Sequence, residues 1–363
     1  FFFFFFFFQS ISFMPKPSGF NNQGNTCYMD SALQLLTNST FIQQAVLKNR
    51  TCGPLTESLA VLCDCHGVKQ QTTPQTIKQL MGQKHKLFAG FGQQDSHEFI
   101  TNFLEDSHRE MCPKKTEYQQ IEYENLPLEE AFTKFNEYQQ KYENSDLQQA
   151  VQFTLVKFYE CEECFEKSFS FQIEQQLVLD LDFVEQVAKP VQKKKKYSYW
   201  DSDSYEIAIE KCLDNYFASQ QVDKKCGKCG CQKKHKAYPR LYTVPQQLLI
   251  VLKRFGANRE KIDHQVQFSQ KFSMSKYIFG LQPNGYDLEA VSLHSGGCWG
   301  GHYTAYVVSE GVQYNCDDSH VSTTQISYDD SRAYVLSYKI CEPQIEVTDE
   351  VLQELAVGKD EDE

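Results

Sequence analysis

The apolar residues near the start of the chain recur at the spacing of an amphipathic helix. In residues 27–36, "CYMDSALQLL", they fall at positions i, i+4, i+7 and i+8. These residues are Tyr28, Ala32, Leu35 and Leu36, with Asn25 or Thr26 available as the cap. Similar patterning runs through "SLAVLCDCHGV" and "DSHEFITNFLEDSHREM". We therefore predict that the first 150 residues are mainly helical.

From Val151 the pattern changes to the alternation that is typical of strands. The stretch "VQFTLVKFYECEECFEKSFSFQIEQQLVLDL" predicts a long hairpin around a cysteine pair. "VPQQLLIVLKRF" and "YDLEAVSLHSG" predict further strands, and "GGHYTAYVVSEGVQYNCDDSHVS" predicts two strands around a turn near Ser309 and Glu310. The chain is therefore predicted to be α+β, without an internal repeat.

Both ends and one internal loop are predicted to lie outside the packed fold. Residues 1–18 start with a run of phenylalanines but lack the basic segment and cleavage pattern of a signal peptide. We expect an extension there, with translation starting at Met14. Residues 342–363 end in "KDEDE" and predict an acidic tail. The lysine run in residues 189–205 is compatible with a nuclear signal, although an exposed loop is favoured.

Composition narrows the class of protein. With 363 residues, 41% of them hydrophobic, the chain can bury a large core. A formal net charge of −12 disfavours nucleic acid as a partner, and the absence of a long apolar run disfavours a membrane span. Without a signal peptide, the 14 cysteines are expected to be thiols and metal ligands in a reducing compartment, cytoplasmic or nuclear.

Cys27 has the placement of a nucleophile. It falls in the first turn of the predicted helix, where the helix dipole and unpaired amides favour a thiolate. Asn22, Gly24 and Asn25 just before it could bend the backbone tightly and supply donors for an oxyanion. A buried structural cysteine remains the alternative from this stretch alone.

His302 is the best candidate for the base. It follows the glycine-rich stretch "GGCWGG" and begins the predicted strand "HYTAYVV". With a turn near Ser309 and Glu310, His302 would pair across the hairpin with Asp317 or Asp318. A carboxylate there could fix the imidazole tautomer and leave the other ring nitrogen facing Cys27. The alternative is a pair of aspartates that simply ends a strand.

Two Cys-x-x-Cys pairs predict a structural zinc site. Cys161, Cys164, Cys226 and Cys229 supply four thiolates for tetrahedral zinc, each pair at a hairpin tip. The interval between the pairs is longer than in a compact ribbon, and "CEEC" lacks the glycines of "CGKCG". Two nearby residues, Cys231 and His235, are spare donors, although surface positions are favoured for them. Another cluster, Cys52, Cys63, Cys65 and His66, matches no zinc template and is read as thiols facing helices.

Asp95 and Glu98 in "QQDSHEF" have two compatible interpretations. Their spacing is that of a capping box, which satisfies the first amides of a helix. Alternatively, the carboxylates face a cleft and bind an arginine of a basic peptide, in keeping with the acidic net charge.

Four separated stretches together resemble the ubiquitin-specific proteases, a group of papain-like cysteine peptidases. They are "GFNNQGNTCYMDSALQLL", "QQDSHEFI", "LLIVLKRF" and "YDLEAVSLHSGGCWGGHYTAYV" with its sequel "YNCDDSHVS". The resemblance covers roughly residues 19–340. It implies a catalytic domain over 19–341, with a thumb (about 19–150), zinc-ribbon-like fingers (about 151–240) and a palm (about 241–341).

The resemblance also implies roles for individual residues. Cys27 is the expected nucleophile, His302 the base and Asp317 the residue that orients it, with Asp318 as an auxiliary. Asn22 is expected to help form the oxyanion hole. A last group of residues is expected to contact the ubiquitin tail, namely Asp95, Glu98 and Tyr303.

Three positions depart from the family pattern. Asp30 replaces an asparagine and adds a carboxylate near the start of the nucleophile helix, where it could oppose thiolate formation. Cys316 replaces an aromatic residue, and Val251 a histidine. None of them removes a triad member.

The expected protein is a zinc-containing deubiquitinase that acts on ubiquitinated proteins. The alternatives are a silent ubiquitin-binding scaffold and a protease for a ubiquitin-like modifier.

Overall fold

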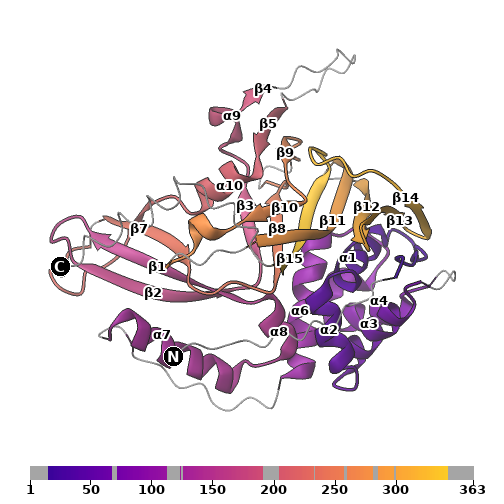
Figure 1. Cartoon of the computed structure of the whole chain (residues 1–363), viewed down its shortest axis with the longest axis horizontal. Helices are drawn as coiled ribbons and strands as arrows, with labels where there is room; N and C mark the ends of the chain where they lie inside the picture. The colour runs from indigo at the N-terminus through magenta and orange to yellow at the C-terminus, as the bar shows by residue number, and fades with distance from the viewer. Residues whose placement is uncertain are drawn as a thin grey trace.

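The computed structural model describes most of the predicted catalytic domain. The described residues are 15–67, 72–112, 123, 126–190, 204–232, 234–256, 260–280, 285–297 and 300–341. Most of the predicted N-terminal extension, residues 191–203 of the predicted lysine-rich loop and the predicted acidic tail at 342–363 lie outside them. Figure 1 shows a group of helices beside a large sheet, with a narrower sheet extending away from both.

The helices before residue 152 confirm the prediction for this part of the chain. They are α1 (Cys27–Thr37), α2 (Thr40–Lys48), α3 (Pro54–Asp64), α4 (Gln75–Lys84), α5 (Lys86–Ala89), α6 (Ser96–Met111), α7 (Leu128–Tyr142) and α8 (Asp146–Val151). Helix α1 is buried along its whole length, because it lies between α6 and strands of the large sheet. None of the helices in the described ranges is long and apolar enough to span a membrane.

The large sheet has the strand order β14-β13-β12-β11-β15-β8-β3, and β10 also pairs with β11. Its strands are β3 (Leu177–Asp180), β8 (Gln247–Lys253), β10 (Lys271–Ser273), β11 (Gly285–Gly297), β12 (Gly300–Ser309), β13 (Val312–Asp317), β14 (His320–Thr323) and β15 (Ala333–Cys341). Only the β3–β8 pairing is parallel among them. Along β8, Leu249 and Val251 join the core under the helices, while Leu248 and Ile250 join a second core. The continuous apolar run of β8 therefore reflects burial on both faces.

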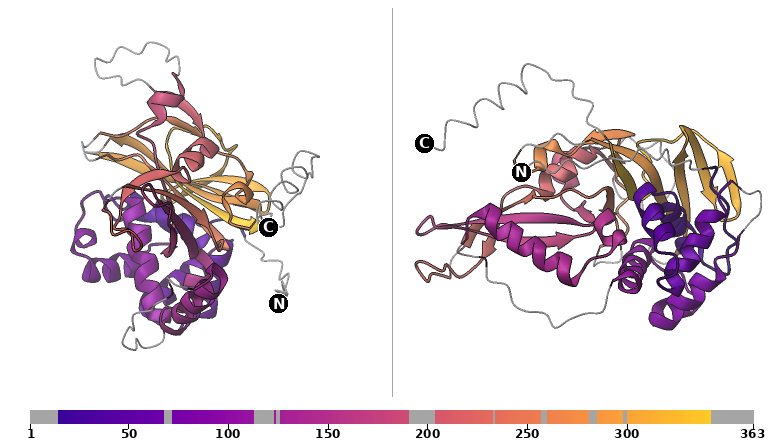
Figure 2. Two further views of the ribbon diagram at one scale, coloured as in Figure 1. Left: turned by 90° about the vertical axis from the view of Figure 1, so that its left-hand side faces the viewer. Right: turned by 60° about the horizontal axis from the view of Figure 1, so that its bottom comes forward.

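The narrow sheet has the order β2-β1-β7-β6. Its strands are β1 (Phe153–Cys161), β2 (Lys167–Glu174), β6 (Gln220–Asp223) and β7 (Lys234–Leu241). The antiparallel β1–β2 pair is the predicted hairpin around the first cysteine pair. Helix α7 covers this sheet through Ala131 and Phe135, which pack with Val156 and Phe171. Figure 2 shows the sheet and α7 lying away from α1–α6.

A small third sheet joins β4 (Lys189–Pro190), β5 (Tyr205–Ala208) and β9 (Gln265–Gln267). Short helices lie beside it in sequence: α9 (Val184–Val187), α10 (Ile209–Tyr216) and the 3₁₀ turn η1 (Ser275–Tyr277). Val184 of α9 and the buried apolar side chains of α10 belong to the second core. In chain order, α9, β4, β5 and α10 lie between β3 and β6, and β9 and η1 lie between β8 and β11.

The predicted pairing of the β12–β13 hairpin was wrong in its register. The turn consists of Glu310 and Gly311, both with positive φ (51° and 75°), and Ser309 pairs with Val312. Two left-handed residues are what a type I′ hairpin turn requires. Continuing this register sets Thr304, and not His302, opposite Asp317. His302 lies two residues further along the same face, which makes it a diagonal neighbour of Asp317.

Candidate active site

Cys27 is the first residue of α1 and follows a tight turn. Gly24 and Asn25 adopt left-handed conformations, with φ of 97° and 55°. Thr26 occupies the N-cap position, but its side chain does not cap the helix. The turn brings the chain sharply into α1, so that Cys27 is only 4% exposed.

The thiol of Cys27 has a raised pKa, contrary to the expectation that the helix start would lower it. Burial is the largest cause, and the neighbouring carboxyl groups of Asp318 and Asp30 add to it. Hydrogen bonds from the backbone N–H groups of Tyr303 and Tyr28 act in the opposite direction. Desolvation and two nearby carboxyl groups outweigh the helix terminus, because a thiolate at this site would be both dehydrated and repelled.

His302 and Asp317 lie in direct contact. The distance between His302 Nε2 and Asp317 Oδ1 is 2.6 Å, and the two side chains are 44% and 48% exposed. Cys27 lies close to this pair, because its sulfur is within hydrogen-bonding reach of the backbone N–H of Tyr303, the residue after His302. With Nε2 held by a carboxylate, Nδ1 is the ring nitrogen left for a proton transfer.

Asn22 is held at both ends of its amide group. Its Oδ1 accepts hydrogen bonds from the backbone N–H groups of Gly24 (2.9 Å) and Thr26 (3.2 Å). Its Nδ2 donates to Asp318 Oδ2 at 3.0 Å. Since an amide nitrogen has two hydrogens, one remains for a further acceptor. The structure thus joins Asn22 and Asp318 across 296 positions of sequence.

The three residues expected to bind substrate have different surroundings. Asp95 caps α6 by accepting a hydrogen bond from the backbone N–H of Glu98 at 2.9 Å, and it also accepts one from the Tyr334 hydroxyl at 2.7 Å. Glu98 is exposed. Tyr303 is buried, with its ring 4.5 Å from the ring of His294. The structure therefore confirms that Asp95 caps α6. The side chain of Glu98 is exposed to solvent.

Gln93 is part of the site region but was not singled out from the sequence. Its side-chain amide donates to Gly301 O and accepts from Gly301 N, at 2.9 Å each. A Cβ atom on Gly301 would lie 2.3 Å from His294 Nε2, so only glycine fits there. The first glutamine of "QQDSHEF" and the glycine before His302 were visible in the sequence, but nothing there indicated that they meet.

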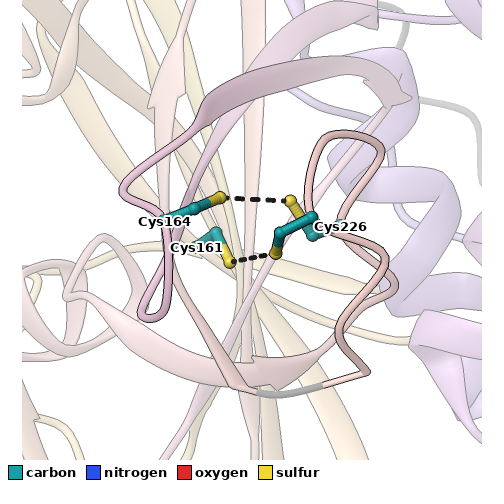
Figure 3. A group of neighbouring side chains, drawn as sticks. Cys161, Cys164 and Cys226 are labelled. Carbon is teal, nitrogen blue, oxygen red and sulfur yellow. Dashed lines mark hydrogen bonds between the residues drawn. The ribbon is translucent and has the colours of Figure 1, made fainter.

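The four cysteines predicted to bind zinc come together at the tips of two hairpins. Cys161 and Cys164 lie in the β1–β2 turn, and Cys226 lies in the facing β6–β7 connection (Figure 3). The sulfur–sulfur distance is 3.6 Å for Cys164 and Cys226, and 3.9 Å for Cys161 and Cys229. A tetrahedral zinc with sulfur ligands at about 2.3 Å needs separations of about 3.8 Å. The donor set therefore fits a tetrahedral metal ion.

The two cysteine turns have the same backbone form. Four residues after the first cysteine of each pair, Phe165 and Gly230 adopt positive φ (58° and 71°) and donate a backbone hydrogen bond to that cysteine's carbonyl. Backbone N–H groups of Cys164 and Glu163 lower the pKa of Cys161 to about 6. Equivalent groups of the second turn lower the pKa of Cys226. The second cysteine of each turn has a raised pKa instead, about 12 for Cys164 and about 11 for Cys229, because neighbouring thiols and burial disfavour a second thiolate when no metal ion is bound.

The spare donors near the metal site differ from the expectation of surface residues. Cys231 Sγ lies 3.2 Å from Cys229 Sγ and 3.5 Å from Cys161 Sγ, so it is a fifth thiol at the cluster. His235 is buried and pairs with Cys161 between β7 and β1. The remaining candidates, Cys52, Cys63, Cys65 and His66, form no three-donor group in the described residues.

Comparison with known proteins identifies the family. A family model described as ubiquitin carboxyl-terminal hydrolase matches residues 18–338, which is most of the chain. The chain belongs to the ubiquitin carboxyl-terminal hydrolase family. The match includes every candidate active-site and metal-binding residue described above.

Two curated members of the ubiquitin carboxyl-terminal hydrolase family illustrate the degree of similarity. Ubiquitin carboxyl-terminal hydrolase 17-like protein B of Mus musculus is 27% identical over 334 residues, which cover 88% of this chain and 63% of that protein. Ubiquitin carboxyl-terminal hydrolase 36 of Drosophila ananassae is 28% identical over 354 residues, covering 89% and 28%. The chain therefore spans less than two thirds of the length of these relatives.

Solved structures from SAGA have the same fold. The SAGA DUB module Ubp8/Sgf11/Sus1/Sgf73 bound to monoubiquitin matches with a TM-score of 0.68 and 21% identity, covering 90% of this chain and 70% of that one. The module bound to ubiquitin aldehyde matches with a TM-score of 0.68 and 20% identity, covering 92% and 72%. This likeness confirms the predicted α+β fold with thumb, fingers and palm.

Two of the residues that depart from the hydrolase family pattern, Cys316 and Val251, are buried in the core. Cys316 is 2% exposed, and burial raises the pKa of its thiol to about 12, so it is an inert packing residue beside Asp317. Val251 is buried within β8. The third departure, Asp30, is buried in α1 and faces the active site.

Proposed function

We propose that this chain is a cysteine deubiquitinase, which hydrolyses the isopeptide or peptide bond at the C-terminal glycine of ubiquitin. The observation that carries the proposal is the His302–Asp317 contact beside Cys27 at the start of α1, in a chain of this family. A histidine held by a carboxylate next to a thiol is the arrangement needed for nucleophilic catalysis of acyl transfer.

In the proposed mechanism, His302 first acts as a base. Because burial and nearby carboxyl groups raise the pKa of Cys27, the resting thiol is neutral and His302 takes its proton as the sulfur attacks the glycine carbonyl. Asp317 stabilises the imidazolium that forms. His302 then protonates the departing lysine amine, and the carbon–nitrogen bond breaks to leave a thioester on Cys27. Water attacks the thioester, giving up a proton to His302, and releases the ubiquitin carboxylate and the free thiol.

Asn22 is proposed to stabilise the oxyanion of each tetrahedral intermediate. The hydrogen of Nδ2 that is not bonded to Asp318 is available for this task. Loss of one oxyanion donor typically costs about 10²- to 10³-fold in turnover. Asp318 acts as an auxiliary by holding the amide.

The ubiquitin tail is proposed to run past the start of α6. Glu98 is exposed, and Asp95 has lone pairs beyond those used in capping, so both can accept hydrogen bonds from arginines. Tyr303 is buried, so we assign it a supporting role: its backbone N–H lies at Cys27, and its ring packs beneath the active site. The acidic net charge of the chain agrees with a basic tail as ligand.

We infer that the cysteine cluster holds a structural zinc ion through Cys161, Cys164, Cys226 and Cys229. When bound, the zinc ties the two hairpin tips together and contributes to folding, with no part in the hydrolysis. Ubiquitin and ubiquitinated proteins are the proposed partners, and the cytoplasm or nucleus is the proposed location, because free thiols persist in a reducing compartment.

A ubiquitin with a thiol-reactive electrophile at its C-terminus tests the proposed function. We expect a covalent adduct on Cys27, identified by intact mass and peptide mapping, and no adduct with Cys27→Ala. The variant should still bind ubiquitin, since its tail contacts are unchanged. Ubiquitin bound without an adduct on Cys27 would point to a silent scaffold. Reaction only with a ubiquitin-like modifier would redirect the substrate assignment.

A further inference from the structure

Asp30 and Asp318 form a pair of carboxyl groups next to the nucleophile. Asp30 lies on α1 and is 2% exposed, and its carboxyl group is within hydrogen-bonding distance of that of Asp318 in the β13–β14 turn. Asp30 Oδ1 and Asp318 Oδ1 are both buried, and neither has another hydrogen-bond partner among the described residues. The two unpartnered oxygens are therefore available to each other.

Two buried carboxyl groups in contact favour a state in which they share one proton. Two carboxylates in contact repel, so ionising both is unfavourable and one keeps its proton. Burial, followed by the charge of Asp318, raises the pKa of Asp30 well above its ordinary value. Of the two, Asp30 is the group whose protonated form is favoured, and its O–H could then donate a charge-assisted hydrogen bond to Asp318.

The pair connects directly to the residue proposed to stabilise the oxyanion. Asp318 Oδ2 accepts the hydrogen bond of Asn22 Nδ2, while Asp30 Oδ2 accepts from Thr26 Oγ1 at 3.4 Å. Thr26 Oγ1 in turn lies 3.3 Å from Asn22 Oδ1. These contacts close a ring of four side chains around the start of α1, so that the orientation of Asn22 depends on how Asp318 is held.

Other titratable groups also face this pair. On α1, Cys27 and Tyr28 both interact electrostatically with Asp30. On the large sheet, His302 and Asp317 lie with Asp318 in one cluster whose ligand atoms are within 4.8 Å of one another. A substitution at Asp30 keeps all of these groups, but it also alters the pKa values of Cys27 and Tyr28, so the pH profile is paired with a direct measurement of the Asp30 proton.

We propose that Asp30 is a positioning residue of the active site: its protonated carboxyl group fixes the carboxylate of Asp318, which orients the Asn22 amide towards the oxyanion. The inference rests on the proposed function, since it concerns how the oxyanion donor is held. Removing the proton from Asp30 would set two charges against each other and release Asn22. Turnover is then lost as the pH rises and Asp30 ionises.

Asp30→Asn is the informative variant. An asparagine has the same shape, its amide can donate to Asp318 and its oxygen can accept from Thr26, but it cannot ionise. At neutral pH the pair carries one negative charge in the wild type and in the variant. Asp30→Ala, in contrast, leaves Asp318 without its donor.

The test is kcat and KM for ubiquitin-conjugate hydrolysis against pH. We expect Asp30→Asn to stay within about threefold of wild type at neutral pH, and the ratio of wild-type to variant kcat to fall as the pH rises. Asp30→Ala should lose about 10- to 100-fold in kcat, with KM nearly unchanged. This loss is smaller than the one expected when the Asn22 donor is removed altogether. Equal pH profiles for wild type and Asp30→Asn would overturn the inference.

A second measurement separates this inference from the proposed function and from a folding defect. The infrared difference spectrum between wild type and Asp30→Asn should show the carbonyl stretch of a protonated carboxylic acid at neutral pH, whether or not the protein turns over ubiquitin. Absence of that band, in variants with a wild-type thermal unfolding transition, would overturn the inference. Absence of hydrolysis by the wild type, with the band present, would count against the proposed function alone.

Discussion

Cys27 lies in surroundings that favour its neutral thiol. The sulfur is buried and faces the carboxyl groups of Asp318 and Asp30, while two backbone N–H groups only partly compensate. A neutral thiol at rest is less open to unwanted oxidation or alkylation than a thiolate. Activation then depends on proton transfer to His302 when substrate is in place.

The pH dependence of Cys27 alkylation follows from its raised pKa. Since the ordinary value is 9.0 and the shift is upward, the thiolate fraction at neutral pH is smaller than for an exposed cysteine. We expect the iodoacetamide reaction rate at Cys27, measured by peptide mass spectrometry, to keep rising beyond pH 9. Cys27→Ala gives the background from the other cysteines. A plateau below pH 8 would contradict the assignment.

Asp95 has a capping role and a proposed binding role, which one substitution can separate. Asp95→Asn retains a good N-cap, so the free energy of unfolding should change by less than about 1 kcal/mol. Ubiquitin affinity should fall, and less so at high salt, because a charge on the tail loses its partner. Titration calorimetry at two salt concentrations measures this. Glu105→Gln, on the outer face of the same helix, is the control with unchanged affinity. If Asp95→Asn lost stability but kept its full affinity for ubiquitin, the capping role alone would remain for Asp95.

At the scale of helices and strands, some features of the fold can be predicted from sequence patterns and others cannot. Local periodicity indicated α1, α6, the β1–β2 hairpin and the strands around His302, because burial on one or both faces sets those patterns. The β12–β13 register was wrong, since it depends on which two residues form the turn. The left-handed Phe165 was not predicted either, because an aromatic residue there is strained and gives no glycine signal.

Contacts between distant segments of the active site were beyond such patterns. Asn22 meets Asp318, and Gln93 meets Gly301 across 208 positions, through the packing of helices on the sheet. The residue types at Cys27, His302 and Asp317 could be recognised from motifs. The orientation of Asn22 and the contact with Asp30 require the folded chain, because no local spacing encodes them.

The hairpin tips should depend on zinc. Elemental analysis is expected to find one zinc per chain in the wild type and none in a variant with Cys226→Ser and Cys229→Ser. Hydrogen exchange should then rise in β1, β2, β6 and β7 while the large sheet stays protected, because the metal joins only the tips. Cys231→Ser is the matched control and should retain zinc. If Cys231→Ser lost zinc and Cys229→Ser kept it, Cys231 and not Cys229 would be the fourth ligand.

At the scale of the molecule, one buried carboxylate joins the helices to the large sheet. Glu289 on β11 accepts hydrogen bonds from the backbone N–H of Thr40 at 2.8 Å and from Gln247 at 3.1 Å, and it pairs with Lys339 at 3.3 Å. These partners belong to α2, β8 and β15. The junction lies where the β11–β15 register shifts, between Leu288 and Ala290.

Removing this carboxylate should weaken the whole molecule. Glu289→Ala leaves buried donors without an acceptor, so we expect the free energy of unfolding to fall by about 2 kcal/mol or more in urea titrations. Glu105→Ala breaks only an exposed pair with Arg109 and should cost less than about 0.5 kcal/mol. Similar losses for the two variants would show that Glu289 does not couple the two parts.

The arrangement of the cysteine turns has a consequence for the order of events during synthesis. Cys164 and Cys226 are 62 positions apart, and in the folded chain the β1–β7 pairing brings the second tip to the first. At about 5 to 20 residues per second, the first thiol pair leaves the ribosome some 3 to 12 s before its partners. During that interval the β1–β2 hairpin carries two unprotected thiols, one of them acidified by its own backbone. A reducing environment would therefore keep this thiol pair from oxidising until the proposed zinc site is complete.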